Sequence, residues 1–170
     1  MTEYRRASLL GATWFFTVNM AERKGNRLLV EEVAALRNAF RSVWVGHAFR
    51  IDAAVILPDH WHCIWTLPPG DSDFSTRWGL IKGTFSRSIK KGERVSLSRV
   101  KRGERGLWQW RFWEHLIRHE DDFASHVDYI HWNLHRVADW PLSSFHADVR
   151  RGIYPADWGG EVVADVEAGE

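Results

Sequence analysis

The stretch AFRIDAAVILPDHWHCIWTL, residues 48–67, decides the fold of this chain. Residues 48–57 are rich in apolar and β-branched side chains and predict one strand, and residues 60–67 predict a second. Pro58 and Asp59 stand between them, and both residue types favour a tight turn. We therefore expect two neighbouring antiparallel strands joined by a short hairpin link.

Further strands and helices alternate on both sides of this hairpin. The other expected strands are residues 12–19 and 107–117, and the expected helices are residues 30–44, 74–89 and 120–135. Apolar side chains recur with a helical period in these helices, and the last one also has an acidic first turn. The order β-α-β-β-α-β, followed by a helix, predicts an α+β fold of the ferredoxin-like split βαβ type. Its antiparallel sheet would carry helices on one face and leave the other face free for a ligand.

The size and composition of the chain fit one globular domain. We expect this domain to span residues 1–160 and to be followed by an acidic, flexible tail at residues 161–170. No apolar run approaches the roughly 20 residues that span a bilayer, and the N-terminus lacks the apolar region of a secretory signal. The single cysteine, Cys63, excludes an intramolecular disulfide and a cysteine-based zinc cage. These features predict a cytoplasmic protein.

Basic side chains are concentrated between residues 77 and 105, although the net charge of the chain is only +1. Such a stretch is typical of proteins that bind a polyanion, but a solvated basic loop would give the same pattern. Glycines punctuate residues 92–106, which predicts a loop there. The chain also contains 11 tryptophans. Buried ones would fill the core and exposed ones could stack on unpaired bases, and composition alone does not separate the two.

His60 and His62 are the sharpest chemical signal in the sequence. Residues i and i+2 of a strand point to the same face, so both imidazoles project together while Trp61 and Cys63 point to the other face. Neutral imidazole is a common ligand for divalent metal ions. Two histidines form only part of a metal site, and an isolated His-x-His pattern is more often without a metal.

A tyrosine and an asparagine on the last expected helix complete the set of candidate reactive groups. The apolar stripe of that helix consists of Phe123, Val127, Ile130 and Leu134. Tyr129 and Asn133 lie off this stripe, and their i,i+4 spacing makes them neighbours. The phenol offers a nucleophile and the carboxamide oxygen a third metal ligand, although a tyrosine at the edge of a core would show the same pattern. Phosphodiester cleavage needs a nucleophile and a cation beside the attacked phosphate.

Seven motifs together resemble the HUH endonucleases, and more narrowly the REP-associated tyrosine transposases, a domesticated branch of single-tyrosine transposases. The motifs are YRRA (4–7), GATWFFTVN (11–19), LPDHWHCIW (57–65), LWQWRFWEH (107–115), HVDYIHWN (126–133), DWPLSSFH (139–146) and GIYPADWGG (152–160). The resemblance therefore covers nearly the whole chain.

The resemblance implies a reaction and the residues that perform it. Tyr129, on a helix added to the ferredoxin-like sheet, would attack DNA to leave a 5′-phosphotyrosine and a free 3′-hydroxyl. His60, His62 and Asn133 would hold Mg²⁺ or Mn²⁺. The implied substrate is single-stranded, hairpin-forming repetitive palindromic DNA, bound by a monomer in the bacterial nucleoid. The residues expected to contact DNA are Arg5, Arg6, Lys82, Arg87, Lys90 and Lys91, and Glu114 and His115 would support the site.

One departure from the family pattern keeps an alternative open. The family commonly continues after the asparagine with proline and a short basic, glycine-containing stretch, whereas here residues 134–137 read LHRV. A copy that grips hairpin DNA or RNA without cutting it would also use the basic stretch and the tryptophans. A histidine-triad nucleotide hydrolase is excluded, because its pattern has a further histidine where Ile64 stands.

Overall fold

Four strands form one antiparallel sheet. They are β1 (Thr13–Asn19), β2 (Arg50–Ile56), β3 (His60–Thr66) and β4 (Trp113–Leu116), in the order β2-β3-β1-β4. In the computed structural model the described residues are 9–93, 95, 97–103, 105–132, 140–155 and 158. The expectations for Arg5, Arg6, Asn133 and the tail 161–170 lie outside these residues.

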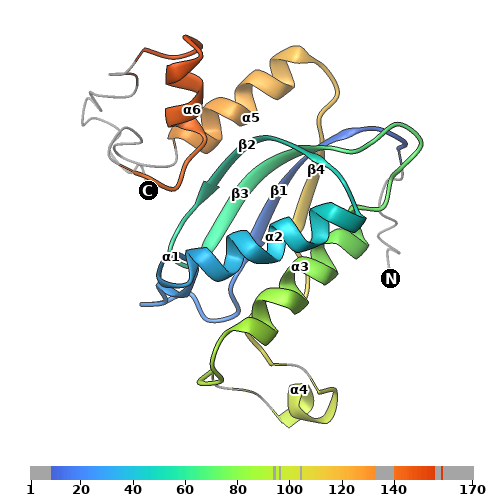
Figure 1. Cartoon of the computed structure of the whole chain (residues 1–170), viewed down its shortest axis with the longest axis vertical. Helices are drawn as coiled ribbons and strands as arrows, with labels where there is room; N and C mark the ends of the chain where they lie inside the picture. Colours follow the sequence, from blue (N-terminus) through green and yellow to red (C-terminus); the bar gives the residue numbers. More distant parts are fainter. Residues whose placement is uncertain are drawn as a thin grey trace, which may run out of the picture.

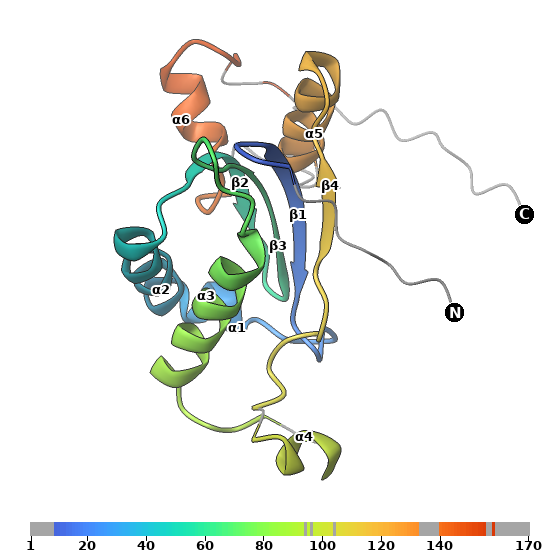
Figure 2. The same cartoon turned by 90° about the vertical axis from the view of Figure 1, so that its right-hand side faces the viewer.

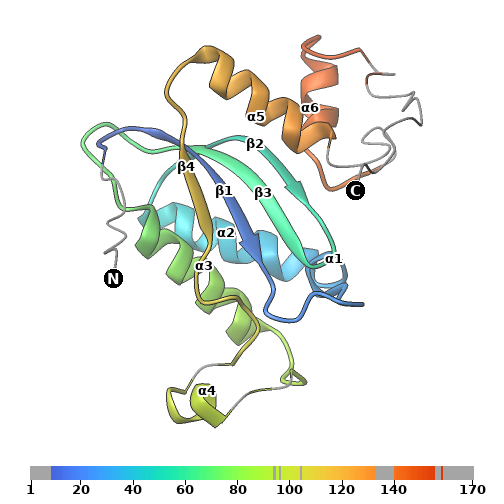
Figure 3. The same cartoon turned by 180° about the vertical axis from the view of Figure 1, so that it is seen from behind.

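Helices lie on both sides of this sheet, which gives an α+β fold (Figure 1). They are α1 (Leu28–Glu31), α2 (Val33–Gly46), α3 (Phe74–Ser88), α4 (Leu97–Lys101), α5 (Glu120–Trp132) and α6 (Phe145–Arg150). Figure 2 shows α2 and α3 together on one side of the sheet, and Figure 3 shows the opposite face, with α5 crossing its upper end. The expectation that this second face is free is therefore wrong where α5 packs against β2 and β3. None of the described helices is long and apolar enough to cross a membrane.

The alternation of side chains along the strands builds two cores. Trp14 and Phe16 of β1 and Trp61 and Trp65 of β3 point toward α2 and α3, where the rings of Trp65 and Trp78 stack 4.0 Å apart. The smaller core on the other face is formed by Phe15, Ala53, Val55, Leu57, Ile64, Val127 and Ile130. The four tryptophans of the larger core are at most 2% exposed, whereas Trp110 is 68% exposed. The apolar face expected for the helix at 74–89 is confirmed, since its members are all buried: Phe74, Trp78, Ile81, Phe85 and Ile89.

Two of the expected elements are interrupted. The helix predicted at residues 30–44 is divided into α1 and α2, because Glu32 has φ −105° and ψ 29°, outside the helical range. The strand predicted at 107–117 is confined to β4. Trp108 forms only an isolated bridge with Met20, and continuous pairing with β1 begins at Trp113. The loop predicted at 92–106 contains the short helix α4.

The segment at residues 140–144 covers the edge of β2 that does not pair with β3. The Ile56 N–H donates to the Leu142 carbonyl (2.9 Å), and the Ser144 N–H donates to the Ala54 carbonyl (2.8 Å). The Trp140 indole N–H donates to the Ile56 carbonyl at 2.8 Å. An uncovered edge strand would present unpaired backbone groups to other chains, so this segment of the DWPLSSFH motif protects the sheet.

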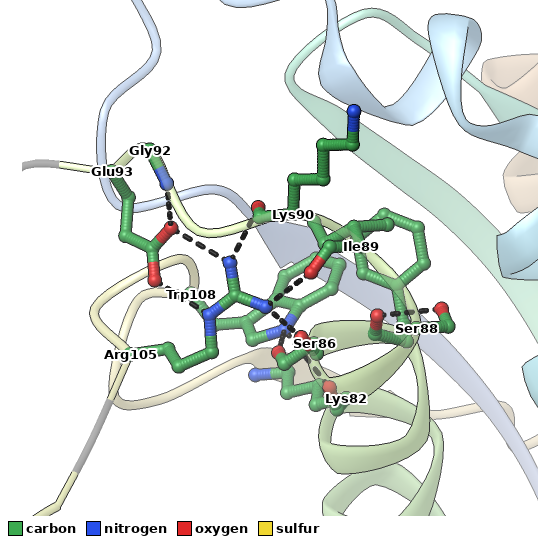
Figure 4. Close-up of polar contacts among 10 residues, drawn as sticks. Lys82, Ser86, Ser88, Ile89, Lys90, Gly92, Glu93, Arg105 and Trp108 are labelled. Carbon is green, nitrogen blue, oxygen red and sulfur yellow. Dashed lines mark hydrogen bonds and ion pairs between the residues drawn. The ribbon is translucent and has the colours of Figure 1, made fainter.

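Arg105 holds the end of α3 and the start of the following loop (Figure 4). Its guanidinium donates to the carbonyls of Ser86, Ile89 and Lys90, the last two at 2.9 and 2.8 Å. The same group donates to both carboxylate oxygens of Glu93, at 2.6 and 2.8 Å. The last carbonyls of a helix have no partner within it, and a cation is favourable there. Arg105 is therefore a structural cap for α3.

This cap makes part of the stability depend on pH. The hydrogen bonds from Arg105 lower the pKa of Glu93 to about 2, from an ordinary value of 4.5. A carboxylate with a depressed folded-state pKa stabilises the fold above its unfolded-state pKa and loses that contribution as the pH falls toward the lower value. In urea denaturation, Glu93→Gln should be less stable than the wild type at neutral pH, and the difference should shrink as the pH falls from 4.5 toward 2. A difference that is independent of pH would contradict this, and Glu22→Gln, at an exposed carboxylate, is the control.

Candidate active site

His60 and His62 project from the same face of β3. Their neighbours Trp61 and Cys63 point into the core beneath α2 and α3, whereas Ile64 belongs to the core on the α5 side. The ring centroids of the two histidines lie 5.1 Å apart. His62 is 4% exposed and His60 is partly exposed, so the pair is more accessible at His60 than at His62.

Each histidine ring is fixed through its Nδ1 atom. The Thr17 hydroxyl oxygen lies 2.8 Å from Nδ1 of His62. A carboxylate oxygen of Asp59 lies 2.6 Å from Nδ1 of His60, and Arg23 donates to the other oxygen of Asp59 at 2.6 Å. In the tautomer in which Nδ1–H donates to such an oxygen, Nε2 carries the free lone pair of the ring and is the atom that can bind a cation.

The electrostatics of the site favour a neutral His62 imidazole. Burial, together with the nearby His60 and Arg23, lowers the pKa of His62 to about 4. Burial alone would raise the pKa of Asp59, but its hydrogen bonds to His60 and Arg23 lower it. At neutral pH the site thus contains a neutral His62 and an ionised Asp59, the states in which a histidine coordinates a metal and a carboxylate orients it.

Tyr129 lies beside this pair. Its ring centroid is 5.3 Å from that of His62 and 5.9 Å from that of Phe15, whose ring also stacks on His62 at 5.7 Å. The residue is 50% exposed. The structure therefore brings together α5 and β3, the elements that carry the predicted nucleophile and the predicted metal ligands, and it leaves the phenol open to solvent.

Tyr154 is held in a different way. Its hydroxyl donates to Asp128 at 2.7 Å, and its ring packs against Trp158 at 4.7 Å. Burial, followed by the hydrogen bond to Asp128, raises the pKa of Tyr154 above its ordinary value. A phenol that is held protonated and engaged is a poor nucleophile. Tyr129 is thus better placed than Tyr154 for attack.

Two curated proteins are similar to the chain over nearly its whole length. One is a REP-associated tyrosine transposase of Escherichia coli K12, which is 47% identical over 176 residues and aligns with 100% of this chain and 98% of its own. The chain belongs to the REP-associated tyrosine transposases. A second protein named for the same family, from Haemophilus influenzae, is 40% identical and aligns over 94% of each chain. The relatives are transposases, so this family member is an enzyme. No family model matches the sequence.

A solved structure supports the same assignment. It is a REP-associated tyrosine transposase bound to a REP hairpin, with 46% sequence identity and a TM-score of 0.81. The match covers 100% of this chain and 98% of that one.

The histidine pair of this transposase fits the divalent metal that its family implies. Both rings project from one face of β3, and each has an oxygen neighbour at Nδ1, the usual support of a metal-bound histidine. A third ligand has to come from elsewhere, and Asn133, which is expected to supply it, follows the last described residue of α5.

Four of the six basic residues expected to contact DNA lie in the described part of the chain. They are Lys82 and Arg87 of α3, together with Lys90 and Lys91 after it. Because α3 covers the other face of the sheet, the structure does not gather these cations around Tyr129 (Figure 2). Lys82 lies near one end of the sheet: its Nζ donates to the Gln109 carbonyl (3.4 Å), and the Gln109 N–H donates to the Asn19 carbonyl (3.0 Å). Asn19 is the register partner of His60.

Not every basic residue of the stretch is available to DNA. Arg77 is 3% exposed and forms an ion pair with Asp71 at 2.6 Å. It also donates to the carbonyls of His47 and Ala48. Arg105 is the cap of α3 described above. Counting charges along the sequence therefore overestimates the surface that faces a polyanion.

Glu114 and His115 point to opposite faces of the sheet. His115 is paired with Phe15, on the side of the histidine pair, and Glu114 is paired with Phe16, on the side of the larger core. His115 contacts Asp122 and His126 of α5, two residues that sequence reasoning does not select. Their i,i+4 spacing is a signal that could have placed them on one helix face.

Sequence reasoning also misses the groups that hold the histidine rings. From the sequence alone, Asp59 is placed only in the turn, although its position directly before His60 could have indicated a contact with that ring. Thr17 is 45 residues from His62 in the chain, and only the β1–β3 register brings them together.

We expect Asp59→Asn to weaken the binding of Mn²⁺ roughly 10–100-fold, because a neutral amide orients His60 less firmly than a carboxylate. Isothermal titration with Mn²⁺ measures this, with His62→Ala as the baseline that lacks the pair. Asp52→Asn is the matched control, since Asp52 forms an ion pair with Arg50 in the same hairpin and does not contact either histidine ring. Equal affinities for wild type and Asp59→Asn would contradict the role given to Asp59.

Proposed function

We propose that this chain is a metal-dependent single-strand DNA endonuclease and strand transferase that acts through Tyr129. The observation that carries the proposal is the position of the Tyr129 ring, half-exposed and 5.3 Å from the ring of His62. A nucleophile that is open to solvent and adjacent to potential metal ligands is the arrangement that phosphoryl transfer needs.

The proposed first step is an in-line displacement at phosphorus. The Tyr129 oxygen forms a bond to phosphorus as the bond to the 3′-oxygen of the preceding nucleotide breaks. The phenol proton is lost to solvent, and the leaving oxygen gains a proton to become a 3′-hydroxyl. The product is a 5′-phosphotyrosine, which keeps the energy of the broken bond for a second transfer. In that transfer an acceptor 3′-hydroxyl attacks the phosphotyrosine and releases Tyr129.

His60, His62 and, following the family pattern, Asn133 would hold Mg²⁺ or Mn²⁺. The ion would polarise the attacked phosphate and offset its charge. Thr17 and Asp59 keep the two imidazoles oriented, and Phe15 contacts both the His62 ring and the Tyr129 ring. The nucleophile and the ligands thus rest on rigid elements of the fold, as precise positioning requires.

The proposed substrate is a hairpin of the REP type that carries a single-stranded flank. The similar solved structure is of a family member bound to a REP hairpin. Lys82, Arg87, Lys90 and Lys91 would neutralise phosphates beside the end of the sheet. Arg5 and Arg6 would act near the bases that flank the hairpin, as the family pattern implies.

The fold is proposed to be of the ferredoxin-like type. The strand order β2-β3-β1-β4 and the all-antiparallel pairing support this assignment.

The domain is proposed to span residues 1–160 and to act as a monomer on DNA in the bacterial nucleoid. His115, on the site side of β4, would support the site, and Glu114 would act only indirectly from the other face.

Tyr129→Phe should abolish cleavage while hairpin binding and stability persist, because only an exposed hydroxyl is removed. The measurement is cleavage of a labelled hairpin with a single-stranded flank in the presence of Mn²⁺, alongside binding and thermal unfolding. The wild type should form a covalent adduct on the 5′ side of the cut that survives denaturing electrophoresis.

Tyr154→Phe is the matched control and should still cleave, because that hydroxyl contacts Asp128 and not the histidine pair. Full cleavage by Tyr129→Phe, or an adduct mapped to Tyr154, would overturn the assignment of the nucleophile. A wild type that binds the hairpin and forms no adduct with metal present would favour the alternative function, a hairpin-binding module without catalysis.

Replacing Lys90 and Lys91 together by alanine should weaken hairpin binding and reduce the slope of log Kd against log salt by about two, roughly one for each lost phosphate contact. Fluorescence anisotropy at several salt concentrations measures the slope. Arg41→Ala, an exposed cation on α2, is the matched control and should leave the slope unchanged. Identical slopes for the double variant and the wild type would exclude these lysines from the DNA surface.

A further inference from the structure

A second cluster of potential metal ligands lies where β4 meets the first turns of α5. It consists of His115, Asp122 and His126, each with one ligand atom within 4.8 Å of the others. Nε2 of His115 lies 3.1 Å from both carboxylate oxygens of Asp122. Nδ1 of His126 lies 3.0 Å from one of these oxygens and 2.8 Å from the backbone carbonyl oxygen of Asp122. The three side chains are partly buried, with exposed fractions of 31%, 14% and 20%.

The fold brings these ligands together from two separate elements. His115 faces the α5 side of the sheet because it is the register partner of Phe15. Asp122 and His126 are one helical turn apart, so they share a face of α5. The two imidazole rings stack with centroids 4.6 Å apart, and the Arg118 N–H holds the Asp122 carboxylate at 3.0 Å.

This cluster is separate from the His60–His62 pair. The Phe15 ring lies between them, 5.7 Å from the His62 ring and 4.8 Å from the His126 ring. A single ion could not be shared across a phenyl ring, so the cluster would hold an ion of its own.

Two imidazoles and one carboxylate form a ligand set for divalent transition metals. Zn²⁺ and similar ions bind such groups at roughly 2.0–2.2 Å, which at a tetrahedral centre places pairs of ligand atoms roughly 3.3–3.6 Å apart. The nitrogen–oxygen separations of 3.0 and 3.1 Å are slightly shorter, so small rotations of the side chains would accommodate the ion. Mg²⁺ prefers oxygen ligands and near-octahedral geometry, so it would not favour this set.

We propose that His115, Asp122 and His126 bind a divalent transition-metal ion of the Zn²⁺ type. The ion joins β4 to α5 at a point three residues before Tyr129. It therefore clamps the helix that presents Tyr129 against the sheet that carries His62. The clamp is independent of the reaction proposed above, since it needs neither His60 nor His62.

The test uses the full chain with His60→Ala and His62→Ala, which removes the first pair of ligands. Co²⁺ is the probe, because its visible absorption reports inner-sphere nitrogen and oxygen ligands. This protein should retain one bound Co²⁺ per chain in equilibrium dialysis, and adding Zn²⁺ should raise its thermal unfolding midpoint. His126→Gln in the same background should weaken Co²⁺ binding by at least roughly a hundredfold and remove the thermal shift.

Two further variants keep the test decisive. His115→Gln should have the same effect as His126→Gln and serves if that variant does not fold, as judged by circular dichroism. His47→Gln, at an exposed histidine outside both clusters, should retain the ion and the shift. Absence of bound Co²⁺ in the His60→Ala, His62→Ala protein would overturn the proposal, as would equal retention by the His126→Gln variant. Either result would leave the three residues as a hydrogen-bonded contact between β4 and α5.

Discussion

The backbone ladder between β1 and β3 is the interaction on which the rest of this structure depends. It pairs Thr13–Asn19 with residues 60–66 without interruption and aligns Thr17 with His62. Because side chains alternate along a strand, a shift of one residue would turn both histidines into the aromatic core and the tryptophans out of it. The register that buries Trp61 is thus the same register that presents His60 and His62. Core packing and site geometry are specified together, by one set of hydrogen bonds.

The arrangement of the site also depends on the packing of α5 against the face of the sheet that lies opposite to α2 and α3. Val127 and Ile130 pack on that face, and the adjacent His131 is fully buried, with its Nε2 atom 3.1 Å from the Ser144 hydroxyl. Ser144 belongs to the segment that covers the edge of β2, so α5 is attached to the sheet both directly and through this segment. Tyr129 projects from the same helix and remains half-exposed. The packing thereby fixes the proposed nucleophile without enclosing it.

Local patterns predicted most of the elements and failed where pairing between distant residues decides. The hairpin around Pro58 and the apolar face of α3 follow from nearby residues, and the structure confirms both. The apolar run at 107–117 also satisfies the strand pattern, yet only Trp113–Leu116 pairs continuously with β1, in a ladder that ends at Thr17. Beyond it, Gln109 and Trp108 make only single contacts with Asn19 and Met20. Similarly, Arg77 belongs to a basic stretch in the sequence but is buried against Asp71 in the fold.

The sequence by itself determined the α+β class, the shared face of His60 and His62, and the position of Tyr129 off the apolar stripe of its helix. Each of these follows from a periodicity that spans a few residues. Only the tertiary structure decided that Tyr129 stands beside His62 and that Thr17 and Asp59 hold the two rings. It also decided that His115 meets Asp122 and His126. Apart from the adjacent Asp59 and His60, these contacts join residues on different elements, and their distances depend on strand register and helix packing, which no local pattern encodes.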